Sequence, residues 1–221
     1  MPDDSTLRAM VTAELEWEPS LDAAHIGVTA RNGVVTLSGF VDSYAAKMAA
    51  ERAAARVQGV TAVAEEIEVR LPSHQKHADD EIAERAVRIL AWDVEVPHER
   101  IQLKVEHGIV TLTGDVGYQF QRVAAEAAVR RLGGTRGVMN LIRVLPAAGP
   151  PTDPDIVQQR IENALRRNAE VEASRIDVSV DGGKVTLRGQ VQTWFERSVA
   201  EHAAWGAPGV TEVKDELRVQ P

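Results

Sequence analysis

Apolar residues recur along this chain at the spacings of helices and strands, and the same succession of patterns occurs three times. Leu7, Val11 and Leu15 are four residues apart, which is the spacing of the buried face of an amphipathic helix. Ile26 and Val28 then alternate with other positions, which is typical of a strand buried on one face. The matching helix positions lie 75 residues further on in each later copy: Ile82, Ala86 and Leu90, then Val157, Ile161 and Leu165. This constant register predicts an internal triplication.

Each copy contains a motif that predicts a β-hairpin. It is NGVVTLSG at 32–39, HGIVTLTG at 107–114 and GGKVTLRG at 182–189. The glycine at its second position falls where a two-residue turn needs a positive φ, and Asn-Gly is a favoured type I′ pair. The glycine at its last position is expected where the chain leaves the sheet or approaches a helix closely. The six glycines are Gly33 and Gly39, Gly108 and Gly114, and Gly183 and Gly189.

A second helix and a closing strand follow each hairpin. The helix is rich in alanine, and its predicted buried face consists of Ala49 and Ala53, Ala124 and Ala128, and Val199 and Ala203. The chain is therefore predicted to be an α+β protein of three tandem αββαβ domains, each a small three-stranded mixed sheet covered by two helices. We expect the domains at 1–70, 79–145 and 153–221, joined by a linker at 71–78 and a proline-rich linker at 146–152.

These features resemble the BON (bacterial OsmY and nodulation) domain. The resemblance rests on the αββαβ order, the hairpin motif and the Gly-Val pair before the closing strand, at 59–60, 137–138 and 209–210. It implies that the six glycines serve the fold and that the domains are not enzymes. It also implies a secreted or envelope protein of the osmotic or general stress response, with phospholipid or another protein as a partner.

The composition excludes several kinds of chemistry. The 221 residues include no cysteine, so disulfides, thiolate nucleophiles and cysteine-bound metals are excluded. The net charge of -8 opposes binding to nucleic acid. The N-terminal residues lack the pattern of a signal peptide, and no run of about 18 apolar residues occurs. We therefore expect a cytoplasmic protein without a transmembrane segment, or a periplasmic one if a leader has been removed.

No arrangement of residues predicts a catalytic or cofactor site. His74 and His77 have the spacing of two metal ligands, but the sequence indicates no third ligand, and Gln75 and Lys76 favour a solvated linker. The remaining histidines share no column between copies, and no nucleotide-binding or nucleophile motif is present. We predict no metal, no cofactor and no enzymatic activity.

Four aromatic residues fall in columns that are not uniformly apolar. They are Trp17 and Trp92 at the end of the first helix, and Tyr44 and Trp194 at the start of the second. The same columns hold Arg167 and Gln119 in the remaining copies, which indicates partial exposure. We expect these aromatic side chains at an interface between copies, between subunits or with lipid headgroups. Capping of each small core is the alternative.

Charge is distributed unevenly among the copies. Residues 1–70 have a net charge of -5, residues 71–146 are neutral and residues 147–221 have -3. The second copy is therefore the best candidate for an anionic partner, although a solvated helix face would also explain its basic residues. These residues are Arg122, Arg130, Arg131 and Arg136.

The leading functional hypothesis is a non-catalytic, stress-associated scaffold that assembles with itself as a homo-oligomer, for example a ring. Its neutral second copy has the least self-repulsion and is expected to make the closest subunit contact. The competing hypothesis is peripheral binding to phospholipid at the cell envelope. No nucleic-acid partner is expected.

Overall fold

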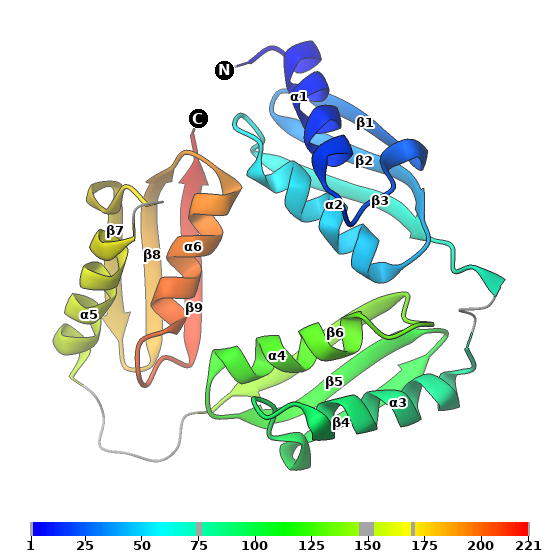
Figure 1. Cartoon of the computed structure of the whole chain (residues 1–221). Coiled ribbons are helices and arrows are strands. Elements are labelled where there is room, and N and C mark those ends of the chain that lie inside the picture. Colours follow the sequence, from blue (N-terminus) through cyan, green and yellow to red (C-terminus); the bar gives the residue numbers. More distant parts are fainter. Residues whose placement is uncertain (1, 74–76, 146–152, 169–170, 221) are drawn as a thin grey trace.

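The computed structural model describes residues 2–73, 77–145, 153–168 and 171–220, which form three domains of the same architecture (Figure 1). The first contains α1 (Asp4–Trp17), β1 (Ile26–Arg31), β2 (Val34–Val41), α2 (Tyr44–Arg56) and β3 (Ala62–Val69). The second contains α3 (Asp79–Trp92), β4 (Ile101–Glu106), β5 (Ile109–Val116), α4 (Gln119–Arg130) and β6 (Gly137–Val144). The third contains α5 (Pro154–Arg167), β7 (Ile176–Asp181), β8 (Lys184–Val191), α6 (Trp194–Trp205) and β9 (Glu212–Val219). The predicted tandem α+β architecture is confirmed.

Each domain has one mixed sheet of the same topology. The strand order is β1-β2-β3, β4-β5-β6 and β7-β8-β9, so the second strand of each domain lies in the middle. The first two strands form an antiparallel hairpin, and the third runs parallel to the second after the crossover through the helix. The strand register is the same in all three, for example Val28 opposite Leu37 and Leu103 opposite Leu112.

The first helix of each domain packs its predicted apolar stripe onto the sheet. Leu7, Val11 and Leu15 are almost completely buried, as are their equivalents in α3 and α5. The middle strand contributes the other half of the core through Val35 and Leu37 and their equivalents. The alternation of apolar and polar residues in the sequence is therefore what separates the covered face of each sheet from its open face.

The second helix agrees with its predicted orientation in the first domain and is turned by one residue in the other two. In α2, the predicted Ala49 and Ala53 are both buried, as are Ala50 and Ala54. In α4 the fully buried positions are Ala125 and Val129, and in α6 they are Ala200 and Ala204. The predicted positions in α4 and α6 are only half-buried.

The third hairpin also differs from its prediction. Gly33 and Gly108 have φ of 80° and 79°, and each follows a non-glycine residue that also has a positive φ. In the third hairpin the positive φ of 58° is at Gly182, and Gly183 has none. A glycine with positive φ at the first turn position is the pattern of a type II′ turn. The Gly-Gly pair permits this alternative, which Asn-Gly and His-Gly do not favour.

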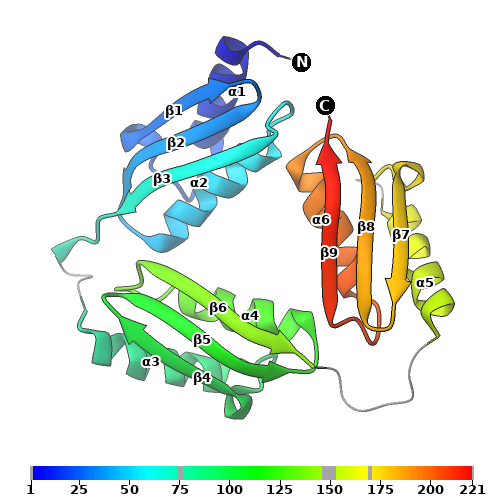
Figure 2. The same cartoon turned by 180° about the vertical axis from the view of Figure 1, so that it is seen from behind.

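The three domains are arranged as a closed ring within one chain. In Figure 1, α2, α4 and α6 face the centre of the ring, whereas α1, α3 and α5 lie toward its outside. Figure 2 shows β3, β6 and β9 as the strands nearest the centre. The same view shows the open faces of all three sheets on one side of the molecule, which we call the β face.

Candidate functional site

The ring is held by three junctions, and the first of them is built around Tyr44. The backbone N–H of Val138, in the free edge of β6, donates to the Tyr44 hydroxyl oxygen. Glu126 and Arg130 of α4 also lie close enough to act on this hydroxyl group. Burial is the main reason why the pKa of Tyr44 is raised above its ordinary value. The start of α2 therefore covers part of the β6 edge.

The junction between the third and first domains is built around Trp194. Its ring packs against the core of the first domain, while the guanidinium of Arg197 stacks on it at 4.6 Å from the ring centroid. Arg197 is held by an ion pair of 2.6 Å with Asp215 of β9. The Trp194 Nε1 group is buried and makes no hydrogen bond within the described residues. This contact is therefore mainly apolar.

The third junction joins the second and third domains. Trp205, at the end of α6, packs against the cores of both domains. Gln119 begins α4, and its side-chain oxygen is buried without a hydrogen bond from any described residue. Tyr44, Gln119 and Trp194 occupy one column of the repeat, which we call the junction column. Of the predicted interface residues, Tyr44 and Trp194 thus lie between copies.

The other two predicted interface residues are not at these junctions. Trp17 ends α1 and is 82% exposed, and Trp92 ends α3 and is 86% exposed. Side chains this exposed make little contact with their own domain. They remain candidates for a partner outside the chain.

The four arginines of the second domain do not act as one group. Arg130 lies at the Tyr44 junction, near Arg52 of α2, whose pKa is lowered mainly by burial and next by Arg130. Arg122 is half-buried on α4 and its carbonyl accepts from the Asn140 side chain. Arg131 and Arg136 are exposed. Arg136 lines the crevice that contains Leu71 and His77.

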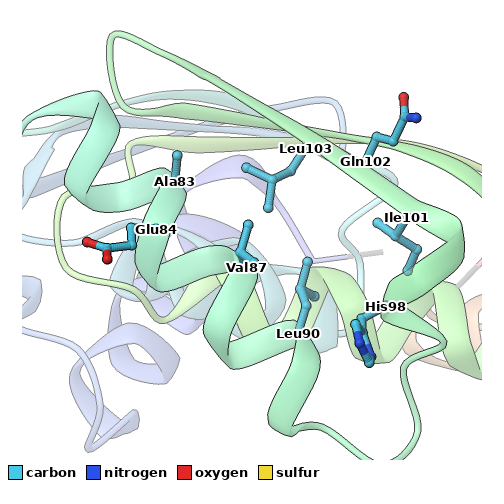
Figure 3. A pocket seen from close by; sticks show the side chains of 8 residues that line it. All are labelled: Ala83, Glu84, Val87, Leu90, His98, Ile101, Gln102 and Leu103. Carbon is cyan, nitrogen blue, oxygen red and sulfur yellow. The ribbon is translucent and has the colours of Figure 1, made fainter.

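A groove between α3 and β4 was not predicted from the sequence (Figure 3). It is open to solvent and has a volume of about 590 Å³. Val87 from the helix, and Ile101 and Leu103 from the strand, form its apolar walls, and His98 lies at one end. Val87 is 56% exposed, and the other two copies have Thr12 and Glu162 at its position. The comparison of these columns is the sequence signal that could have indicated the groove.

Exposed apolar side chains are concentrated on the second domain. Of the fifteen large hydrophobic residues exposed in the described parts of the chain, ten belong to this domain, three to the first and two to the third. Three of the ten, Ile109, Met139 and Leu141, lie on strands β5 and β6. The domain with no net charge is therefore also the one that exposes most apolar surface.

Several ionisable side chains stabilise the domains by accepting backbone N–H groups or by forming ion pairs. The Asp79 carboxylate accepts the backbone N–H groups of Gly108 and His107, which lowers its pKa. Ion pairs with Lys214 and Arg188 lower the pKa of Glu216 to about 2.

Neither a cluster of metal ligands nor a membrane-spanning helix occurs among the described residues. His77 is hydrogen-bonded to Glu81 and Arg85, whereas His74 lies outside the described residues. The described residues contain no cluster of three or more side chains suited to a metal ion. Within that same part of the chain, no helix is both long and apolar enough to span a membrane.

Comparison with known proteins identifies the repeated unit. The BON domain profile matches residues 3–70, 78–146 and 153–221, which confirms the predicted resemblance in three tandem copies. Osmotically-inducible protein Y of Escherichia coli is 34% identical over 143 residues, which are 62% of this chain and 71% of that protein.

Two further relatives match over shorter stretches. The 21 kDa hemolysin of Actinobacillus pleuropneumoniae is 37% identical over 73 residues, and the outer membrane lipoprotein DolP of Haemophilus influenzae is 34% identical over 74. Each of these matches covers 33% of this chain and 38% of the other protein.

Proposed function

The chain belongs to the BON domain family, and from this premise we propose that it is a non-catalytic scaffold of the stress response that associates with other copies of itself. The stress assignment is supported by the likeness to a protein named for osmotic induction, which extends over 71% of that protein. The proposal that the chain is not an enzyme is supported by the roles of its ionisable groups, which cap turns and form surface ion pairs.

One observation carries the proposed self-association. The second domain exposes ten large hydrophobic side chains and has no net charge, whereas the domains beside it are acidic. Exposed apolar surface of this kind is typical of protein contacts. The ring itself is closed within one chain, so self-association has to use surfaces outside the junctions.

Sedimentation velocity of the full chain tests this function directly. We expect the sedimentation coefficient to rise with protein concentration, from the value of a 24.0 kDa monomer to that of a larger species. In the native host, we expect more of the protein after a shift to high osmolarity. A protein that stays monomeric up to near-millimolar concentration would contradict the proposed self-association.

Peripheral binding to phospholipid at the cell envelope is the second candidate function. It is favoured by the two exposed indoles of Trp17 and Trp92, because indole groups partition into the interface of a bilayer. One relative is named as an outer membrane lipoprotein. The net charge of -8 opposes binding to anionic lipid. Flotation of the protein with neutral and with anionic vesicles, and of a variant with both tryptophans replaced by alanine, tests this candidate.

A further inference from the structure

We propose that two copies of this chain associate through their β faces, with the open sheet face of the second domain at the centre of the contact. This inference rests on the proposed self-association and assigns it to a surface. The central residues are Ile109, Met139 and Leu141, which we call the apolar patch.

The sheet register places the apolar patch on the open side of the second domain. Ile109 is opposite Gly137 on β5 and β6, and Met139 and Leu141 are opposite Thr111 and Thr113. The patch residues are 44%, 51% and 54% exposed. The residues that alternate with them, such as Val110 and Ile142, are buried under the helices. The patch therefore spans two neighbouring strands and is uncovered within the chain.

The third domain carries charges at all three of these positions, and the first domain carries one at the position of Leu141. Met139 corresponds to Ala64 and Lys214, Leu141 to Glu66 and Glu216, and Ile109 to Val34 and Lys184. The fold thus tolerates charged side chains here, and open or edge strands are commonly protected from association by such charges. Only in the second domain is this protection missing at both β6 positions, so the apolar side chains are not required by the architecture of the sheet.

The charges around the patch favour a second copy over a charged partner. Asp115 and Arg143 pair with each other at 2.7 Å at one end, and Lys104 and Glu106 pair at 2.8 Å on β4. The whole of residues 71–146 has no net charge. A neutral apolar surface does not repel itself, and it provides no field that would attract a nucleic acid or an anionic membrane. Such a surface can be self-complementary across a twofold axis.

The area of the β face is sufficient for a stable dimer. Strands of up to eight residues, spaced by about 4.8 Å, give one three-stranded sheet roughly 350 Å² of open face. Three sheets on the same side therefore offer roughly 1,000 Å² (Figure 2), and a standard interface needs about 800 Å² from each partner. The patch alone is too small, so the contact has to extend over the neighbouring domains.

A twofold axis through the second domain, lying in the plane of the β face, arranges those neighbours favourably. It sets the two second domains against each other and brings the first domain of one copy over the third domain of its partner. The charges on the open faces of these neighbours are largely paired within each sheet: Arg70 pairs with Glu68 in the first domain, and Lys214 and Arg188 pair with Glu216 in the third. Paired charges of both signs then form a polar rim around an apolar centre, as in typical protein interfaces.

The test exchanges residues between equivalent positions. In the variant M139K/L141E, the second domain receives the residues that the third domain has as Lys214 and Glu216, so folding is expected to persist. The control variant F120E/V123K places the same charges at exposed apolar positions of α4, outside the sheet. Sedimentation velocity from micromolar to near-millimolar concentration measures dimerisation of the wild type and both variants, and circular dichroism verifies their folding.

We expect a wild-type dimer, a dissociation constant raised at least about tenfold in M139K/L141E, and a change of less than about twofold in the control. A folded M139K/L141E variant that dimerises like the wild type would overturn the assignment to the β face and leave the proposed self-association standing. A wild type that remains monomeric would overturn both. Equal weakening by the control variant would show that α4, not the sheet, makes the contact.

Discussion

The last glycine of each hairpin motif is required by the backbone of the neighbouring strand. Gly39, Gly114 and Gly189 have φ of 114°, 133° and 127°, a region that L-residues rarely adopt. A Cβ atom added at Gly114 would lie 2.1 Å from the Arg100 carbonyl oxygen, and the other two positions are equally close to backbone oxygens. Neither the torsion angle nor the space permits another residue.

The substitution Gly114→Ala is therefore expected to destabilise the second domain by roughly 3 kcal/mol or more, from backbone strain and steric overlap together. Hydrogen exchange of β4 and β5 in the full chain measures this loss. The matched control is Gly137→Ala in the same domain, because Gly137 has no positive φ and an added Cβ would lie 3.8 Å from its nearest neighbour, the Ile109 side chain. The control is expected to change stability by less than about 0.5 kcal/mol. Equal effects of the two substitutions would contradict this explanation.

The Asp79 carboxylate makes the second domain sensitive to acid. Its pKa is lowered because it accepts the N–H groups of Gly108 and His107 in the folded state. The stabilisation is therefore fully present above the unfolded-state pKa and is lost as the pH falls through the lower, folded-state value. The variant Asp79→Ala is expected to melt below the wild type at neutral pH, and the difference should shrink below about pH 4. A difference that stays constant down to the lowest pH would contradict this origin.

At the scale of the elements, the second helix of each domain has two packing faces. One face covers its own sheet, and the other meets the neighbouring domain through the junction column. In α6, Trp194 serves the second purpose by packing on the core of the first domain. Loss of this side chain should therefore separate domains without unfolding them.

The variant Trp194→Ala is expected to cost about 2 kcal/mol at this junction, less than the loss for a fully buried tryptophan. Small-angle X-ray scattering should show a larger radius of gyration, and amides at the end of α2 should exchange faster. Trp17→Ala is the matched control, because Trp17 is 82% exposed and lies outside the junctions. An unchanged radius of gyration in Trp194→Ala would show that Trp194 does not hold the ring closed.

The sequence was sufficient for the first helices, the strands and their register, because their apolar residues have a clear period that recurs in three copies. It was insufficient for the second helix, where α2 has alanine at positions 45, 46, 49, 50, 53, 54 and 55 and so defines no single buried face. The columns of Tyr44 and Trp17 both indicated partial exposure. The arrangement of the domains is what distinguishes these two residues, because Tyr44 lies at a junction and Trp17 is exposed to solvent. The groove at Val87 and the apolar patch could be predicted from the sequence only by comparing the three copies position by position.

At the scale of the whole molecule, the ring places the start of α1 and the end of β9 at the same side, where the first and third domains meet (Figures 1 and 2). A circular permutant that joins these ends through a flexible linker and opens the chain within 146–152 is therefore expected to form the same ring, since surface termini on one side of a molecule permit permutation. Its radius of gyration and melting temperature should match those of the wild type. A permutant that folds into separated domains would contradict the closed arrangement.

The ring has three junctions but only two linkers, because no chain segment joins the third domain to the first. Linkers of this length hold adjacent domains at effective concentrations on the order of millimolar. A contact with a dissociation constant near 1 mM, about 4 kcal/mol, is then already substantially formed within one chain. Closure is unimolecular, so it does not depend on how much protein the cell contains. Three separate BON domains with the same weak contacts would have to be present at millimolar concentration to associate. In the triplicated chain, the covalent linkers supply that concentration locally.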